Sequence, residues 1–455
     1  MLKRQALLCP LRDLGFIFIQ AFRMLKIFKQ ACIRNEKNQM NIKDLTLVIN
    51  TILAVGLMTA SISFAAPSYT LQQVIDVTFS EHPSIRVVRA QEAAALASVT
   101  TAKSFINPEI EMGAGPSRYR SGTNETRNNW GVSLSQPLEF SGVRSARREI
   151  AEANVKFAGV NAEINQVELR TRVKQAFYDV IQRQAALRLV EDDRALLQQI
   201  RERVKLRVDI GESPKYELIK ADTEALAAER DYQAAFVRII EAKAYLQGLV
   251  GKAMPAEYLL LGELPMSQRL APIQSLRDQV SQSPHLKQLR AASETADAKL
   301  RLEQNLRNPG LTLKAGVEQD PDLTSFRLGL AVPLPLWSQR QGQIAEAAAN
   351  VSQVQAVLSD RELALNRDLD SAYQRYLIAQ NQVGAYENGL LKQAESALRV
   401  AESAYRFGER GILEYLDAQR TYRAVKKDYL AARFDYVSTM LEIERLLGAD
   451  LLQAN

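Results

Sequence analysis

The sequence predicts a mainly α-helical protein with a small β part, built from a helical-hairpin unit that occurs twice. Three observations lead to this fold class. Short motifs recur about 197 residues apart. Two proline-free stretches of about 65 residues carry apolar residues at a heptad-like spacing. Four further segments alternate apolar and polar residues, as strands with two different faces do.

The duplication is visible as short motifs that recur at a nearly constant distance. The motifs and their shifts are Asn107-Pro108 and Asn308-Pro309 (201 residues), Ala153-Asn154-Val155 and Ala349-Asn350-Val351 (196), Gly211-Glu212 and Gly408-Glu409 (197), and Val250-Gly251 and Leu447-Gly448 (197). The drop of five residues after the first pair predicts a shorter loop in the second copy. We therefore expect a first repeat over residues 66–251, a linker over residues 252–272 and a second repeat over residues 273–455.

Each copy shows the same order of signals: a short helix, a medium helix, two strands, a very long helix, a glycine turn and another helix. The expected helices cover residues 71–80, 84–106, 143–208 and 215–249 in the first copy, and residues 273–282, 285–307, 342–407 and 412–447 in the second. At ~1.5 Å per residue the longest helices would extend about 100 Å, far more than a globular core requires. Their narrow apolar seam is typical of helices that pack as in coiled coils.

The four alternating segments have about 9–11 residues each, the length of a tilted strand that crosses a bilayer. The residues predicted to face the membrane are Trp130, Val132, Leu134, Leu311, Leu313, Phe326, Leu328 and Leu330. Amphipathic hairpins on a soluble domain are the alternative for any one segment, but equivalent strands in both copies favour a membrane. Because the smallest membrane barrels have about eight strands, four cannot close one, and their open edges must pair with other subunits.

The first 65 residues have the order of a signal peptide. Lys43 precedes an apolar run over residues 45–60, and Ser63-Phe64-Ala65 places small residues at the −3 and −1 positions of a signal-peptidase site. We expect translation to start at Met40, with residues 1–39 as an extension of the reading frame. A short N-terminal membrane anchor is the alternative.

Composition excludes several classes of function for the chain after residue 65. Residues 1–65 contain nine of the 58 Lys and Arg and three of the 52 Asp and Glu, which leaves 49 of each sign and no basic footprint for nucleic acid. Cys9 and Cys32 also precede residue 66, so we expect no disulfide and no lipid-anchor cysteine. His82 and His285 form no cluster, and no nucleophile triad or phosphate loop is present. We therefore expect no metal site, no cofactor and no enzyme.

With these features the chain resembles an outer membrane efflux protein of the TolC-like family over residues 66–452. The most family-like segments are the two strand-to-helix passages, residues 134–144 (LSQPLEFSGVR) and 332–342 (VPLPLWSQRQG), and the far turn, residues 405–419 (YRFGERGILEYLDAQ). The two passages are most similar to the heavy-metal (cobalt-zinc-cadmium type) branch. The resemblance implies a homotrimer whose strands form one shared β-barrel in the outer membrane and whose long helices form a periplasmic α-barrel.

The resemblance also implies partners and a function. Such a protein is the outer-membrane channel of a tripartite, RND-type efflux system, and a periplasmic adaptor (membrane fusion protein) connects it to an inner-membrane pump. The channel itself is passive. Heavy-metal cations, organic compounds and a secreted protein are alternative cargoes, the last two as in drug-efflux and type I secretion channels. A periplasmic coiled-coil scaffold or adaptor is the competing class, but that class needs no alternating strands.

Residues at the far turns match positions that close such a duct in the family. Tyr405, Arg410 and Glu217 match a gate lock, an ion pair with an added tyrosine hydroxyl bond, although Glu stands where the family has Asp and therefore reaches further. Glu414 and Asp417 match an acidic pair that rings the aperture, and their spacing places them on one helical face. Solvated charges on a helix surface are the alternative for both sets.

The adaptor is expected to dock at the turns over residues 208–213 and 406–411. Gly211 and Gly408 are predicted to end the long helices in a left-handed conformation, so recognition would depend on the shape of the turns. The residues assigned to these tips are Val208, Gly211, Glu212, Ser213, Arg406, Gly408 and Gly411.

Overall fold

A computed structural model describes residues 67–118, 126–265 and 269–452. The predicted signal peptide within residues 1–65 and the predicted start at Met40 lie outside them. The fold described below is that of the unit Pro67–Asn455. Within the described ranges, no helix combines the length and the apolarity that a membrane span requires.

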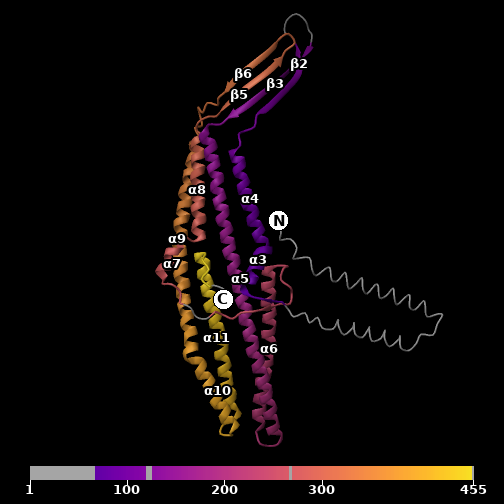
Figure 1. The fold of residues 1–455 in the computed structure, drawn as a ribbon, viewed down its shortest axis with the longest axis vertical. Coiled ribbons are helices and arrows are strands. Elements are labelled where there is room, and N and C mark those ends of the chain that lie inside the picture. The colour runs from indigo at the N-terminus through magenta and orange to yellow at the C-terminus, as the bar shows by residue number, and fades with distance from the viewer. Residues whose placement is uncertain (1–66, 119–125, 266–268, 453–455) are drawn as a thin grey trace, which may run out of the picture. The chain divides into compact units, whose positions relative to one another are not determined.

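The first repeat has its elements in the predicted order (Figure 1). They are β1 (Ser68–Tyr69), α3 (Leu71–Glu81), α4 (Pro83–Lys103), β2 (Glu109–Arg118), β3 (Thr126–Leu138), α5 (Ser141–Asp209) and α6 (Lys215–Val250). Helix α5 has 69 residues, and both α5 and α6 begin and end within two residues of the predicted bounds. The prediction of one very long helix followed by a second one is confirmed here.

The second repeat differs from the prediction at one place. After the linker, which contains β4 (Leu259–Leu260), its elements are α7 (Ile273–Val280), α8 (Pro284–Asn305), β5 (Leu311–Gln319), β6 (Thr324–Ala331), α9 (Gln341–Ala385), the π-helix η1 (Tyr386–Leu390), α10 (Leu391–Arg406) and α11 (Ile412–Leu447). The helix expected over residues 342–407 is present without a gap, but it is not regular throughout, because the π-turn η1 lies between α9 and α10. Figure 1 shows that the chain changes direction where α9 passes into α10, as helices do at π-bulges.

Local sequence sets the helix starts. The Thr70 side chain accepts a hydrogen bond from the backbone N–H of Gln73, whose side chain accepts from the backbone N–H of Thr70, so α3 begins with a capping box. Both medium helices begin with proline, Pro83 in α4 and Pro284 in α8, where the missing N–H is not needed. At the opposite end of the second repeat, Gly448 ends α11 in the left-handed region.

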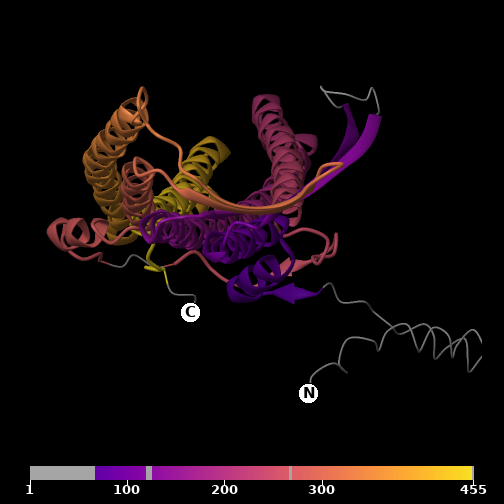
Figure 2. The same cartoon turned by 90° about the horizontal axis from the view of Figure 1, so that it is seen from above.

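The helices lie side by side in one curved layer. Helix α5 packs against α4, α6 and α8, and α9 packs against both α8 and α11. Figure 2, which looks along the helices, shows that this layer is curved, with α3 and α7 on its convex side. Helix α11 also packs against α5, so it joins the second repeat to the first in the half that lies away from the sheet.

The four long strands form one antiparallel sheet in the order β2-β3-β5-β6. The two hairpins, β2–β3 and β5–β6, belong to different repeats, and the pairing of β3 with β5 joins them. In that central pairing Leu134 lies opposite Ala315 and Val132 lies opposite Val317. The sheet therefore continues across the boundary between the repeats, and the small parallel pair β1–β4 joins the start of the unit to the linker.

Buried apolar residues fall into two separate clusters. The main core draws on α3, α5, α6, α7, α9 and α11, and its largest contributors are Phe177, Leu246, Leu369, Tyr376 and Tyr436. The tip core consists of Leu197, Ile200, Val204, Ala221, Ala228, Ile412, Tyr415 and Leu416. The heptad seam predicted for the first long helix is confirmed at Val173, Phe177, Val180, Leu197, Ile200 and Val204, which are buried. Leu187 and Val190, in the middle of the predicted seam, are only partly buried.

Candidate functional site

One face of the four-stranded sheet is apolar and exposed. Directly paired residues of neighbouring strands lie on the same face, and the register aligns Met112, Val132, Val317 and Phe326 in one row across all four strands. Phe326 is 81% exposed and Leu328, in the next row, is 90% exposed. All eight residues predicted to face the membrane share this face: Trp130, Val132, Leu134, Leu311, Leu313, Phe326, Leu328 and Leu330.

The opposite face of the sheet is polar. It carries Glu111, Lys314, Glu318 and Arg327 between glycines and serines, and the Arg327 guanidinium lies 2.8 Å from the Glu318 carboxylate. Apolar and polar residues therefore separate largely by face, with Gln136 opposite Leu313 and Gln319 opposite Trp130 as polar residues on the apolar face. In a monomeric soluble protein an apolar patch of this extent marks an interaction surface, because its contact with water is unfavourable.

The sheet also has two free edges. Within the described residues β2 pairs only with β3, and β6 pairs only with β5. Each edge has 8–10 residues, and it presents unpaired backbone N–H and C=O groups. Such edges need further strands wherever water is excluded, because backbone groups left unpaired in lipid are costly.

The turns at the far ends of the helices have the same geometry in both repeats. Gly211 has φ +82° and Gly408 has φ +74°. The backbone N–H of Glu212 donates to the Arg207 carbonyl at 2.8 Å, and that of Glu409 donates to the Ala404 carbonyl at 2.9 Å. Both long helices therefore end in a Schellman motif, which confirms the predicted left-handed glycines.

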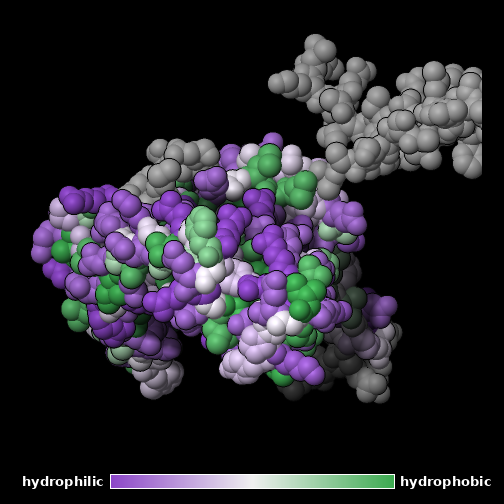
Figure 3. Space-filling view, turned by 90° about the horizontal axis from the view of Figure 1, so that it is seen from below, coloured by the Kyte–Doolittle hydropathy of each residue, from purple (hydrophilic) through white to green (hydrophobic). Residues whose placement is uncertain are grey.

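The surface around these turns is mainly hydrophilic, with scattered apolar residues (Figure 3). Val208 packs partly buried against the tip core, whereas Gly211, Glu212, Arg406, Gly408 and Gly411 are exposed and Ser213 is half-buried. Phe407, beside Arg406, is 82% exposed. The predicted docking residues thus lie together on two short turns.

The three residues of the predicted gate lock lie near one another without forming the lock. Glu217 lies in the first turn of α6, and one of its carboxylate oxygens is 4.0 Å from the position a Cβ on Gly411 would take. No ion pair or hydrogen bond joins Arg410 to Glu217 in the described part of the chain. The Tyr405 ring instead stacks on Tyr415 with centroids 5.8 Å apart.

The acidic pair predicted for the aperture is exposed. Glu414 and Asp417 lie in the first two turns of α11, and both side chains reach solvent. Glu414 is the closer of the two to the lock, because its carboxylate lies 3.4 Å from the position of a Cβ on Gly411. Glu217 and Glu414 therefore approach the same backbone position.

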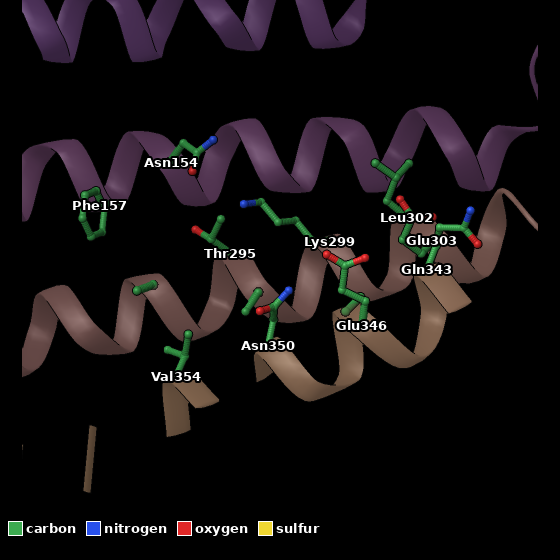
Figure 4. A pocket seen from close by; sticks show the side chains of 13 residues that line it. Asn154, Phe157, Thr295, Lys299, Leu302, Glu303, Gln343, Glu346, Asn350 and Val354 are labelled. Carbon is green, nitrogen blue, oxygen red and sulfur yellow. The ribbon is translucent and has the colours of Figure 1, made fainter. Parts of the chain in front are cut away.

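A cavity of about 580 Å³ lies between α5, α8 and α9. Its lining is mixed, with Asn154 and Phe157 from α5, Lys299 from α8, and Glu346 and Asn350 from α9 (Figure 4). The two asparagines are the equivalent residues of the recurring Ala-Asn-Val motif, so the duplication places them on either side of α8. The prediction of functional residues did not include this cavity.

Two buried charge clusters also escaped the sequence analysis. Lys174 is 1% exposed, and its ammonium group donates to Glu444 at 3.0 Å, to Asp450 at 2.5 Å and to the Leu452 carbonyl at 3.1 Å. Burial raises the pKa of Glu444, against the opposing effect of Lys174. Burial, with the charges of Glu444 and Asp450, also raises the pKa of Tyr178 to about 12.

The second cluster joins the repeats nearer the tips. Asp193 of α5 is 4% exposed, and it accepts hydrogen bonds from Arg423 at 2.6 Å and from Gln419 at 3.0 Å, both on α11. Arg420 of α11 makes a close ion pair with Glu224 of α6. An isolated charged residue in a heptad pattern gives no sequence signal, because a lysine or aspartate there looks like part of the solvated face.

The two histidines have structural surroundings. His82 ends α3, and its ring nitrogen accepts a hydrogen bond from the Ser84 backbone N–H at 3.1 Å. Burial lowers the pKa of His82 and of His285, with nearby arginines adding to the effect. Over residues 67–118, 126–265 and 269–452, no three His, Cys, Asp or Glu side chains gather closely enough to hold a metal ion.

The duplicated long-helix fold with its amphipathic sheet defines the class of outer-membrane efflux channels. The chain belongs to the outer membrane efflux protein family, which it matches over residues 74–252 and 276–449. It is 24% identical over 394 residues to the cobalt-zinc-cadmium resistance protein CzcC of Cupriavidus metallidurans, covering 84% of this chain and 91% of that protein. It is 22% identical to the outer membrane protein TolC of Vibrio cholerae, over 87% and 94% of the two chains.

Solved structures show the same fold. The chain superposes on CusC with a TM-score of 0.69 at 18% identity, covering 83% of this chain and 92% of CusC. It superposes on the outer membrane channel MtrE of Neisseria gonorrhoeae, described in its open state, with a TM-score of 0.68 at 17% identity, over 84% and 89% of the two chains. The resemblance to the TolC-like family drawn from the sequence is confirmed.

Proposed function

We propose that this protein is the outer-membrane channel of a tripartite, RND-type efflux system, a passive duct that carries substrates from the periplasm or from an inner-membrane pump to the exterior. The observation that carries the proposal is the four-stranded sheet. Its apolar face and its two open edges fit lipid on one side and further copies of the same strands at both ends. The working unit is then a homotrimer whose strands close a shared barrel.

The helices supply the periplasmic part of the duct. Helix α5 alone spans 69 residues, or about 100 Å at ~1.5 Å per residue, and the helix layer is curved (Figure 2). Three such layers form an α-barrel continuous with the strands. The polar face of the sheet lines the upper lumen and the exposed acids Glu414 and Asp417 ring the aperture, where they favour cations.

The tips receive the periplasmic adaptor. Two Schellman turns of matching shape, with exposed Gly211 and Gly408, present backbone and small residues that a helical hairpin of the adaptor contacts. The lock of Tyr405, Arg410 and Glu217 closes the tips in the assembled trimer, where Arg410 reaches a carboxylate it does not contact within one chain. An exposed pair of this kind contributes about 0–1 kcal/mol, which suits a gate that an adaptor opens.

Divalent heavy-metal cations are the cargo class we favour. The curated relatives include proteins named for resistance to cobalt, zinc and cadmium and to nickel and cobalt. The acidic aperture suits such cations, and drug export and protein secretion are the competing assignments. A periplasmic scaffold that never enters the membrane is disfavoured by the exposed apolar sheet, which lipid would cover.

The test uses the full chain, expressed with its own leader and purified from the outer-membrane fraction. We expect a heat-modifiable trimer that produces stepwise conductance in planar lipid bilayers. A monomer recovered in the soluble periplasmic extract would overturn the proposal. For the cargo, deletion of the gene should lower the tolerated concentration of cobalt, zinc or cadmium, with tolerance to a hydrophobic dye as the contrasting measurement.

A further inference from the structure

The two repeats differ by one residue within their long helices. Ala176-Phe177 of α5 corresponds to Ala372-Tyr373 of α9 at a shift of 196, whereas the tip glycines Gly211 and Gly408 correspond at a shift of 197. Burial supports the first correspondence. At the shift of 196 the buried residues coincide: Leu169 with Leu365, Val173 with Leu369, Ala176 with Ala372, and Val180 with Tyr376. The second repeat therefore contains one extra residue between these two levels.

The structure accommodates that extra residue as the π-helix η1. The backbone N–H of Leu391 donates to the Tyr386 carbonyl, five residues earlier, so this turn holds one residue more than an α-helical turn. Helix α5 has no such turn at the corresponding level. The insertion thus leaves the packing registers above and below it intact and concentrates the irregularity in one place.

The π-turn is anchored on one side only. None of its five residues is buried, and a Cβ added to Gly389 would meet no atom within 4 Å. Tyr386 packs partly buried against the main core and pairs with the Tyr429 ring of α11 at 6.0 Å between centroids. The Tyr429 hydroxyl also donates to Glu387 at 2.9 Å, so the side of the turn with Tyr386 is anchored and the side with Gly389 is open. A glycine in a solvent-facing, irregular helical turn is where a helix bends most easily.

Between the π-turn and the tips, a polar contact joins the repeats. Asp193 holds Arg423 and Gln419 at the level that separates the main core from the tip core. Gln419 donates through its side-chain nitrogen. Its side-chain oxygen is buried and has no hydrogen-bond partner among the described residues. A polar contact that leaves an acceptor unpaired is easier to open than a packed apolar one.

We propose that η1 is the hinge of the hairpin α10–α11, and that Asp193 with Arg423 and Gln419 is the latch that holds this hairpin against α5. The inference rests on the proposed function, since it assigns the moving part of the periplasmic gate. When the latch opens, the small tip core separates while the main core stays packed. The hairpin α5–α6, which has no π-turn, serves as the fixed frame.

The experiment uses the full-length chain, assembled and purified from the outer membrane, with single-channel recording as the first measurement. Gly389→Ala stiffens the π-turn and should reduce opening events about fivefold, the factor equivalent to the preference of a helix for alanine over glycine. Gly248→Ala is the matched control, because that glycine lies in regular α6 and also has open space around it. Asp193→Asn should increase openings about tenfold, and the exposed neighbour Asp192→Asn is its control.

The second measurement reports the tip distance directly. Cys9 and Cys32 are replaced by serine, spin labels are attached to the exposed positions Ile210→Cys and Phe407→Cys, and trimers are diluted with unlabelled chain. Asp193→Asn should lengthen the distance between labels within one chain, and Gly389→Ala should reduce that lengthening. If each variant behaves as its control while the parent protein conducts, the hinge and latch are refuted and the channel function stands. If the parent never conducts, the proposed function fails, and the label distances still decide the hinge.

Discussion

The two hairpins that form the tips occupy equivalent places in the two repeats, but they differ in how they are connected to the rest of the fold. The hairpin of the first repeat is α5–α6, in which one helix runs unbroken for 69 residues from the sheet to the tip. The hairpin of the second repeat is α10–α11, which η1 separates from α9. Both end in the same Schellman turn, so the difference lies in one inserted residue. One inserted residue is enough to place an irregular π-turn in a long helix, without any change in its overall composition.

A second difference between the repeats is the burial and the partners of the charged residues at one equivalent position. Lys174 and Asp370 correspond at the shift of 196. Lys174 is buried and binds Glu444 and Asp450, whereas Asp370 is partly exposed and pairs with Arg277 at 2.7 Å. The first repeat thus holds the C-terminal end of the unit through its interior, and the second holds the short helix α7 from the surface.

The largest effect we predict is on the stability of the fold when one of these two charges is removed. Lys174→Met leaves the Glu444 carboxylate buried without its cation, and should destabilise the fold by about 3–5 kcal/mol. Asp370→Asn, at the equivalent position, should change stability little, because its partner remains hydrated. The measurement is the midpoint of unfolding in guanidinium chloride, monitored by the helical circular dichroism signal. Equal losses in the two variants would show that the buried cluster does not carry the distinction.

In the sheet, by contrast, the repeats should respond alike. Met112 and Leu313 occupy equivalent places on the apolar face. Arginine at either position should cost about 2–4 kcal/mol of membrane insertion, measured as the yield of trimer in lipid vesicles. Thr312→Arg is the control, since Thr312 lies next to Leu313 and points to the polar face. A loss for Thr312→Arg as large as for Leu313→Arg would contradict the assignment of faces.

The sequence predicts the regular parts of this molecule well because each has a periodic cause. The absence of proline and the heptad spacing indicate α5, and alternation indicates the faces of all four strands. Gly211 and Gly408 mark the turns, since few other residues adopt their left-handed backbone. These signals are local or periodic, so a single chain shows them without any tertiary information.

The remaining features depend on contacts between distant segments. From the sequence alone, Lys174 and Asp193 would be assigned to the solvated face of α5. Their burial becomes visible only when α11 is packed against α5, which brings Glu444 to Lys174 and Arg423 to Asp193. The π-turn did leave a trace, because the repeat shift changes from 196 to 197 between Ala349 and Gly408. That trace indicates an extra residue but not its place, which depends on how α9 and α10 pack.

A third prediction concerns alkaline pH and the first repeat alone. Tyr178 has Gln374 as its equivalent in the second repeat. Its pKa is raised to about 12 by burial and by the charges of Glu444 and Asp450. An unfolded tyrosine ionises near pH 10, so the stability from this neutral hydroxyl is complete below pH 10 and is lost as pH rises towards 12. The loss should be about 1.4 kcal/mol per pH unit in that window. The unfolding midpoint of Tyr178→Phe should fall less steeply between pH 10 and pH 11.5, and parallel curves would contradict the prediction.

The smallest effect is expected where the two hairpins meet. Glu217 of the first repeat and Arg410 of the second lie beside Gly411 without contact in one chain. If they lock in the trimer, Arg410→Ala with Glu217→Ala removes about 0–1 kcal/mol and should raise the mean conductance in planar bilayers by up to about fivefold. Arg406→Ala with Glu402→Ala is the matched control, because that pair lies within α10 at 3.6 Å and joins no two hairpins. Because the lock crosses between hairpins and the control does not, the conductance should respond to the first pair alone. An equal response to both pairs would show that surface charge near the aperture, rather than a bond between the repeats, sets the current.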